Sequence, residues 1–354
     1  MPLGTANPLT TLWPASSTES AMKRPAAFVS DGFRARRLSR RSLLKVGGVG
    51  ILGLASPQQP VPGLPTRRPI LWTADWSPAG EYLAVGGDDG SLRVFSSDLG
   101  LLKAHRLGAA VQCVDWNRDG KTLAIALDDR PVEILDVENG LTIRVRDSAA
   151  GSRALAWNAD GELLAVGDYD GLLKIRARDG KLIRSLKAEG AKAYLSVDWH
   201  PKKDLIVTGS DRIRVFDASG GEPVTIKHRK EDTLVLAVRW HPEGAFFASG
   251  DYGHDDVESL LQFWGEDGTP LKVMRGSQAE YRNVRWSPKG EFLASASDAL
   301  RVWTKDGLLV HVGESPDLLW GLDWDGRSRS IVTSSQKGAI RVWTEEAKRE
   351  REVL

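Results

Sequence analysis

A tryptophan returns about every 41 residues along most of this chain. Seven of its 13 tryptophans follow this spacing, and each ends a short apolar run: Trp76, Trp116, Trp157, Trp199, Trp240, Trp286 and Trp324. The intervals between them are 40, 41, 42, 41, 46 and 38 residues. This period indicates a repeat architecture, because a unit of this size cannot bury both of its faces alone and must stack on its neighbours.

Each repeat reads as four short strands joined by turns. The tryptophan is followed by a turn and a second apolar run, for example WNRDG at 116–120 and then KTLAIAL at 121–127. A fourth run, such as KLIRSLK at 181–187, precedes the next repeat. The third runs end at Phe95, Leu135, Arg176, Phe216, Trp264, Trp303 and Trp343. Seven such units predict an all-β fold, a seven-bladed β-propeller of four-stranded antiparallel blades.

On these repeats the chain resembles the WD40-repeat proteins over about residues 70–345. The resemblance is strongest in the portion W-x-P-x-G-x-x-L-A-x-G, which reads WSPAGEYLAVG at 76–86. It implies that the first strand of each blade lines a central channel and that partners bind at the top face and the channel. A scaffold for protein–protein interaction is therefore the function that the resemblance implies.

The last blade of such a ring needs a strand from near one terminus. The candidates are the Pro-rich segment 60–69 and the charged tail 345–354. Because proline cannot donate to a strand ladder except at an edge, we expect the tail to provide it.

Residues 1–55 differ in kind from the rest. They hold eight basic residues and two acidic ones, and the apolar stretch VGGVGILGLA follows at 46–55. This order is typical of a secretory signal. Within it, SRRSLLK at 39–45 resembles the twin-arginine export motif, with Arg40 and Arg41 as the paired arginines. We therefore predict a protein exported to the periplasm, with a leader that is either disordered or cleaved.

Other interpretations of the leader remain open. Met22 would be a natural start, and cleavage after Ala55 would fit the small residues there. A solvated basic arm has similar charges, and an organellar transit peptide is also rich in Arg and Ser, so the alternatives are an organellar or a cytoplasmic protein. Residues 56–69 contain five prolines and predict an extended linker before a propeller domain at 70–354.

The composition excludes several classes of protein. The whole chain has 48 Lys plus Arg and 47 Asp plus Glu. Residues 56–354 contain 40 of these basic residues and 45 of the acidic ones, which gives a net charge of −5 and argues against nucleic acid as the partner. Cys113 is the sole cysteine and excludes a disulfide framework. No apolar run reaches the length of a membrane-spanning helix.

Two rings of residues are candidates for function. Four residues before each repeat tryptophan stand Trp72, Gln112, Arg153, Leu195, Leu236, Arg282 and Trp320. Tryptophan and arginine are enriched at binding hot spots, so Trp72, Arg153, Arg282 and Trp320 are candidate partner-binding residues, together with Tyr194. The alternative is that these side chains cap the blade cores.

The second ring directly precedes the tryptophans: Asp75, Asp115, Ala156, Asp198, Arg239, Arg285 and Asp323. Two arginines flanked in ring order by aspartates predict ion pairs between blades. Such pairs, if exposed, would contribute about 0–1 kcal/mol each.

The fifth repeat carries the longest interval, with extra residues at 251–258. His254, Asp255 and Asp256 in this insertion are further candidate partner-binding residues. A solvated loop and a divalent-cation site are the other interpretations, although neighbouring residues in a row cannot all converge on one ion.

No nucleophile elbow, phosphate loop, HExxH motif or kinase motif occurs in the chain. We therefore predict no catalytic residue, no metal and no cofactor. The predicted function is an exported, monomeric WD40 scaffold that binds a protein or peptide partner. The alternative is a propeller-type hydrolase or lyase with a site over the central channel, because propeller enzymes scatter their catalytic groups over several blades.

Overall fold

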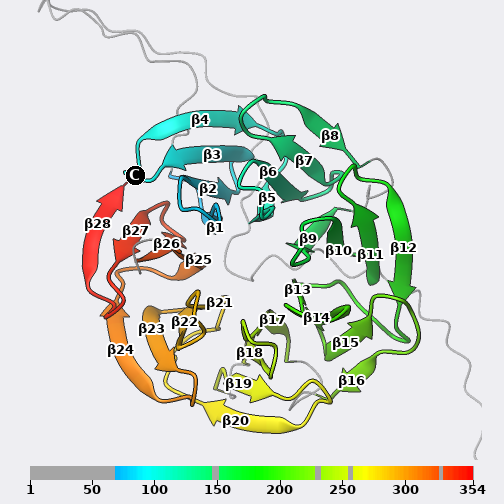
Figure 1. Cartoon of the computed structure of the whole chain (residues 1–354). Helices are drawn as coiled ribbons and strands as arrows, with labels where there is room; N and C mark the ends of the chain where they lie inside the picture. Colours follow the sequence, from blue (N-terminus) through cyan, green and yellow to red (C-terminus); the bar gives the residue numbers. More distant parts are fainter. Residues whose placement is uncertain (1–67, 146–150, 228–232, 254–257, 327–329, 354) are drawn as a thin grey trace, which may run out of the picture. The chain divides into compact units, whose positions relative to one another are not determined.

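Seven four-stranded antiparallel sheets surround a central channel in the computed structural model (Figure 1). The structure describes residues 68–145, 151–227, 233–253, 258–326 and 330–353, and these contain strands but no helix. Every sheet is one run of four consecutive strands, so each blade is a single stretch of chain. The predicted seven-bladed β-propeller is confirmed.

The innermost strand of every blade ends at a repeat tryptophan, as the sequence predicts. These strands are β1 (Leu71–Trp76), β5 (Val111–Trp116), β9 (Ser152–Trp157), β13 (Ser196–Trp199), β17 (Val235–Trp240), β21 (Asn283–Trp286) and β25 (Leu319–Trp324). The second strands are β2 (Tyr82–Gly87), β6 (Thr122–Leu127), β10 (Leu163–Asp168), β14 (Leu205–Gly209), β18 (Phe247–Asp251), β22 (Phe292–Ala296) and β26 (Ile331–Ser335).

The two outer layers complete each blade. The third strands are β3 (Ser91–Ser96), β7 (Glu133–Asp136), β11 (Leu172–Ala177), β15 (Ile213–Asp217), β19 (Leu261–Trp264), β23 (Ala299–Thr304) and β27 (Ile340–Trp343). The rim strands are β4 (Leu101–Arg106), β8 (Thr142–Arg144), β12 (Leu182–Lys187), β16 (Val224–Ile226), β20 (Pro270–Met274), β24 (Leu309–Glu314) and β28 (Arg349–Val353).

The core lies between the blades, and the repeat tryptophans wedge into it. Trp116 packs against Leu92 and Val94 of the preceding blade, and its indole Nε1 donates to the carbonyl of Asp75 at 3.0 Å. Four further tryptophans donate in the same way to the preceding blade: Trp157 to Asp115, Trp199 to Ala156, Trp286 to Arg239 and Trp324 to Arg285. Each of these five tryptophans thus joins two blades by packing and by one indole hydrogen bond.

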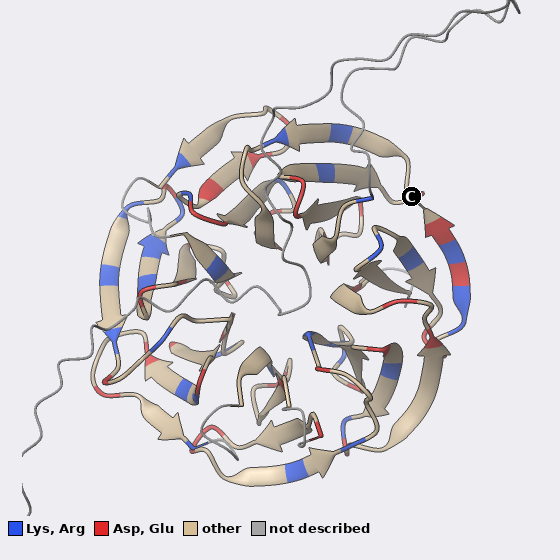
Figure 2. Ribbon diagram, turned by 180° about the vertical axis from the view of Figure 1, so that it is seen from behind, with Lys and Arg blue, Asp and Glu red and all other residues tan. Residues whose placement is uncertain are grey.

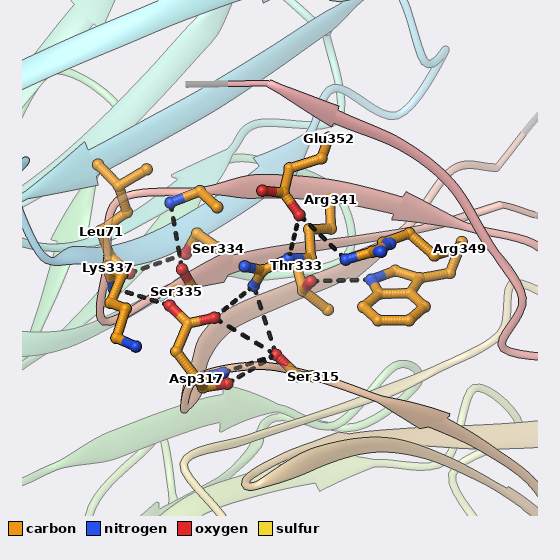
Figure 3. Close-up of polar contacts among 12 residues, drawn as sticks. Leu71, Ser315, Asp317, Thr333, Ser334, Ser335, Lys337, Arg341, Arg349 and Glu352 are labelled. Atoms are coloured by element: carbon orange, nitrogen blue, oxygen red, sulfur yellow. Dashed lines mark hydrogen bonds and ion pairs between the residues drawn. The ribbon is translucent and has the colours of Figure 1, made fainter.

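Blade seven is completed by the charged tail, as expected. All four of its described strands come from residues 319–353, with β28 at the rim. The Arg341 side chain on β27, only 3% exposed, bonds Asp317 Oδ1 and Glu352 Oε2 at 2.8 Å each and so fastens β28 to the blade (Figure 3). Arg and Glu alternate along this strand (Figure 2), and these charges protect its free edge against pairing with other chains.

The ring closes where blade seven meets blade one. The Ser334 hydroxyl donates to the carbonyl of Leu71 at 2.9 Å (Figure 3). A side chain at Gly321 would come within 2.5 Å of the backbone nitrogen of Ala74, so the two inner strands approach closely only because this residue is glycine. The last and first blades therefore meet by the contacts that join other neighbours, without exchange of a strand.

None of the described residues forms an apolar helix long enough to cross a membrane.

Candidate functional site

The channel holds two cavities that differ in charge. The one near the starts of the inner strands has a volume of about 60 Å³ and is lined by Arg153, Arg239, Arg282 and Arg285; we name it the arginine cavity. The one near their tryptophan ends has a volume of about 350 Å³ and is lined by Asp75, Asp115, Asp198 and Asp323; we name it the aspartate cavity. Arg239 and Arg285 line both, so the channel changes from positive to negative along its length.

All seven residues of the first predicted ring line the arginine cavity. These are Trp72, Gln112, Arg153, Leu195, Leu236, Arg282 and Trp320. They converge because each stands four positions before the tryptophan that ends its inner strand, either on that strand or, for Leu195 and Arg282, directly before it, and the seven inner strands face one channel. The structure thus brings together Trp72, Arg153, Arg282 and Trp320, which the sequence singled out as candidates.

Three of these side chains form a stack across blades one, seven and six. The rings of Trp72 and Trp320 lie nearly parallel, with centroids 6.2 Å apart and an angle of 19° between planes. Arg282 places its guanidinium carbon 3.5 Å from the centroid of the Trp320 ring, a cation–π contact. The Glu280 carboxylate forms an ion pair with Arg282 and orients it. The stack is therefore held in place before any partner arrives.

The aspartate cavity has a structural role. Each Asp carboxylate accepts the backbone N–H of the next blade's tryptophan: Asp75 from Trp116, Asp115 from Trp157, Asp198 from Trp240 and Asp323 from Trp76. These bonds are 2.7 to 3.0 Å long and connect neighbouring blades. These carboxylates therefore hold neighbouring blades together.

The predicted ion pairs between blades form around one arginine. Arg285 lies 3.5 Å from Asp75 and 3.5 Å from Asp323, whereas Arg239 donates Nη1 to the carbonyls of Val197 and Val238. The Arg285, Asp75 and Asp323 side chains are 12%, 8% and 17% exposed. The expectation for exposed pairs therefore does not apply, because these pairs are largely desolvated.

Burial shifts the titration of this ring. It raises the pKa of Asp198 and of Asp323 to about 7, and the pKa values of Asp75 and Asp115 also lie above their ordinary range. Burial by itself disfavours the charge of Arg285, but Asp75 and Asp323 outweigh it and raise the pKa of this arginine. Arg285 thus stays charged and compensates the carboxylates on both sides.

Of the other predicted residues, the structure describes Tyr194, which does not join the site. Tyr194 is fully buried in the core of blades three and four, edge to face with Phe216, and cannot touch a partner there. His254, Asp255 and Asp256 lie outside the described residues, as do Arg40 and Arg41. No group of three or more His, Cys, Asp or Glu side chains that could hold a metal occurs in the described part of the chain.

Sequence reasoning missed two kinds of residue. Glu280 was overlooked, although it stands two positions before Arg282 and pairs with it. His200 and His241 contact the carbonyls of Gly244 and Gly290 in the next blade through Nε2, at 3.0 and 2.9 Å. The repeated triplet Trp-His-Pro at 199–201 and 240–242 was the signal for these bridges.

Comparisons with known proteins agree with the fold. The family profile described as "WD domain, G-beta repeat" matches residues 65–96, 146–176, 180–216, 221–257 and 268–303. A second profile, "Anaphase-promoting complex subunit 4 WD40 domain", matches residues 101–152.

Two Arabidopsis thaliana proteins are similar to parts of the chain. "Transcriptional corepressor LEUNIG_HOMOLOG" is 26% identical over 219 residues, which are 58% of this chain and 26% of the relative. "WD40 repeat-containing protein HOS15" is 26% identical over 239 residues, 67% of this chain and 35% of the relative. The chain thus spans about a quarter to a third of the length of these curated relatives.

Proposed function

This chain is a WD40-repeat protein with a seven-bladed β-propeller, and on that premise we propose that it is a monomeric, non-enzymatic scaffold whose partner protein binds over the arginine cavity. Support comes from the repeats and from a relative that is described as WD40 repeat-containing. A rigid disc that presents one preformed site binds without the cost of ordering its own loops.

The observation that carries the proposal is the stack of Trp72, Trp320 and Arg282. Tryptophan and arginine dominate the energy of protein interfaces when they are packed and close to the centre of the contact. Here they lie at the channel, with Arg153 lining the same cavity from blade three. A partner that inserts one side chain at this point would meet all four residues at once.

Replacing Trp320 by alanine is expected to lower the amount of captured partner at least tenfold. The change removes the ring that both Trp72 and Arg282 contact, and a hot-spot residue of this type is worth about 2–4 kcal/mol of binding. The measurement is affinity capture from extracts with tagged parent and variant, followed by identification of the proteins retained.

The matched control is Leu141→Ala, because Leu141 is apolar, 69% exposed and distant from the channel at the rim. It should retain the same partner as the parent, and thermal unfolding should show that the Trp320→Ala variant is folded. Equal capture by the folded Trp320→Ala variant would contradict the proposed site.

We further propose that residues 1–55 direct export by the twin-arginine route. Support comes from the sequence alone, since the paired arginines Arg40 and Arg41 precede an apolar stretch. Export of a folded protein suits a propeller, whose β pairing between distant residues is slow to form.

The double variant Arg40→Lys/Arg41→Lys is expected to abolish export in a bacterial host with a twin-arginine system. The parent should appear in the periplasm, shortened near Ala55, whereas the variant should stay in the cytoplasm at full length. Fractionation and the intact mass of each chain measure this. If parent and variant are found in the same compartment with the same mass, the export proposal is wrong.

A further inference from the structure

The arginine cavity combines positive charge with hydrogen-bond donors that lack a partner. We propose that it binds a carboxylate group of the partner protein between Arg153 and Arg282. The proposal rests on the proposed function, because it names the chemistry of the partner segment that enters the channel. The carboxylate belongs to an Asp or Glu side chain or to a chain terminus, and the experiment below separates these sources.

The first support is the distribution of charge. The residues that line the arginine cavity include four arginines and no Asp or Glu, whereas four aspartates line the aspartate cavity at the other end of the channel. Two of the four arginines, Arg239 and Arg285, are engaged by backbone carbonyls and by the aspartates respectively. Arg153 and Arg282 therefore carry the charge that a ligand would meet, and at Arg282 the ligand would compete with Glu280.

The two arginines line the same cavity, and no Asp or Glu lines it with them. They come from blades three and six. Burial lowers the pKa of Arg282, the Glu280 charge opposes this effect, and the Arg153 charge lowers the pKa further. Burial also lowers the pKa of Arg153. Bringing a negative charge between two desolvated cations relieves their repulsion and is favourable for both.

The second support is a set of buried donors without acceptors. Trp72 Nε1, Trp320 Nε1, Arg282 Nε and Arg285 Nη1 have no hydrogen-bond partner among the described residues. Leaving such a donor unpaired costs about 1–3 kcal/mol. A carboxylate has only acceptor sites, about four of them on two oxygens, so its chemistry matches the donors of this cavity.

The size of the cavity limits what enters. Its volume of about 60 Å³ holds only a few water molecules. A carboxylate head fits this space, whereas a whole peptide does not. The partner must therefore present the carboxylate at the tip of a side chain or at the end of its chain.

The experiment measures fluorescence anisotropy of a labelled hexaglutamate peptide with an amidated C-terminus, titrated with the full-length protein. We expect saturable binding to the parent, and at least a tenfold weaker affinity with Arg153→Gln and with Arg282→Gln. Lys181→Gln removes one charge from an exposed loop before β12 and should leave the affinity unchanged. Hexaglutamine should not bind.

Glu280→Gln gives a test in the opposite direction. Because Glu280 competes for Arg282, its neutralisation should tighten hexaglutamate binding about fivefold, the equivalent of about 1 kcal/mol. A merely structural role of Glu280 would weaken binding or leave it unchanged. Thermal unfolding of each variant shows whether it is folded, and Arg282→Lys, which keeps the charge, should retain part of the affinity.

The outcomes separate the carboxylate proposal from the proposed function. If only a hexaglycine peptide with a free C-terminus binds in an Arg282-dependent way, the ligand is a chain terminus. If neither peptide binds, or if Arg282→Gln and Lys181→Gln bind alike, the carboxylate proposal is overturned. In that case the proposed function still stands if the Trp320→Ala variant captures less partner than the parent. If the folded variant captures as much partner as the parent, the proposed function is wrong, whatever the peptides show.

Discussion

Replacing Arg285 by methionine is expected to lower the free energy of unfolding at pH 8 by about 3–5 kcal/mol. The guanidinium lies 3.5 Å from both Asp75 and Asp323, and all three side chains are largely buried. Methionine fills a similar volume but leaves the two carboxylates desolvated without a compensating charge. Breaking a buried pair from one side is costly for this reason.

The loss should grow with pH. Burial already raises the pKa of Asp323 to about 7 with Arg285 in place, against an ordinary value of 3.8. A group with a raised pKa in the folded state takes up protons that the unfolded chain does not, so its contribution to stability is fully present below about pH 4 and is lost as the pH rises through 7. Without Arg285 the pKa rises further, and the variant should therefore be closest to the parent at pH 5. Denaturant unfolding at pH 5 and pH 8 measures the difference.

Arg239→Met is the matched control. Arg239 has the equivalent position one blade earlier, but its Nη1 donates to the carbonyls of Val197 and Val238. Its removal should cost about 1 kcal/mol, the net worth of ordinary hydrogen bonds. Equal losses in the two variants would show that Arg285 does not compensate the carboxylates.

The sequence repeat was sufficient to predict the seven blades and the seven residues that line the arginine cavity four positions before the repeat tryptophans. The position four before each tryptophan recurs in every repeat, so the sequence alone indicated that these residues share the channel. The contact between Trp72 and Trp320 follows from the ring as well, because blade seven must meet blade one although 248 positions separate these residues.

Other features depend on packing that the repeat does not encode. The repeat does not show whether the charged ring is exposed, and in the structure the narrow channel desolvates Arg285 and its partners. Tyr194 stands next to a channel residue, Leu195, yet its side chain points into the core and packs on Phe216. Neighbouring residues of an extended chain point to opposite faces. Because Tyr194 lies in an irregular segment before β13, the sequence does not show to which face its side chain points.

The largest effect of a single core substitution is expected for Trp116→Ala, which should lower the free energy of unfolding by about 3–5 kcal/mol. Trp116 is 5% exposed, packs between blades one and two and stacks on Tyr82 with centroids 6.0 Å apart. Alanine leaves a cavity at the joint of two blades, which the rigid sheets on both sides cannot close. Denaturant unfolding of parent and variant gives the value.

A comparison of phenylalanine variants separates packing from hydrogen bonding in the wedge. Trp116→Phe and Trp240→Phe both lose ring area, but only Trp116 donates its indole N–H to a carbonyl, that of Asp75. Trp240 Nε1 is buried without a partner among the described residues, so its removal leaves no acceptor unpaired. Trp116→Phe should therefore be more destabilising than Trp240→Phe by about 1–2 kcal/mol. If the two variants lose the same stability, the indole hydrogen bond of Trp116 to the carbonyl of Asp75 adds nothing to the joint between these blades.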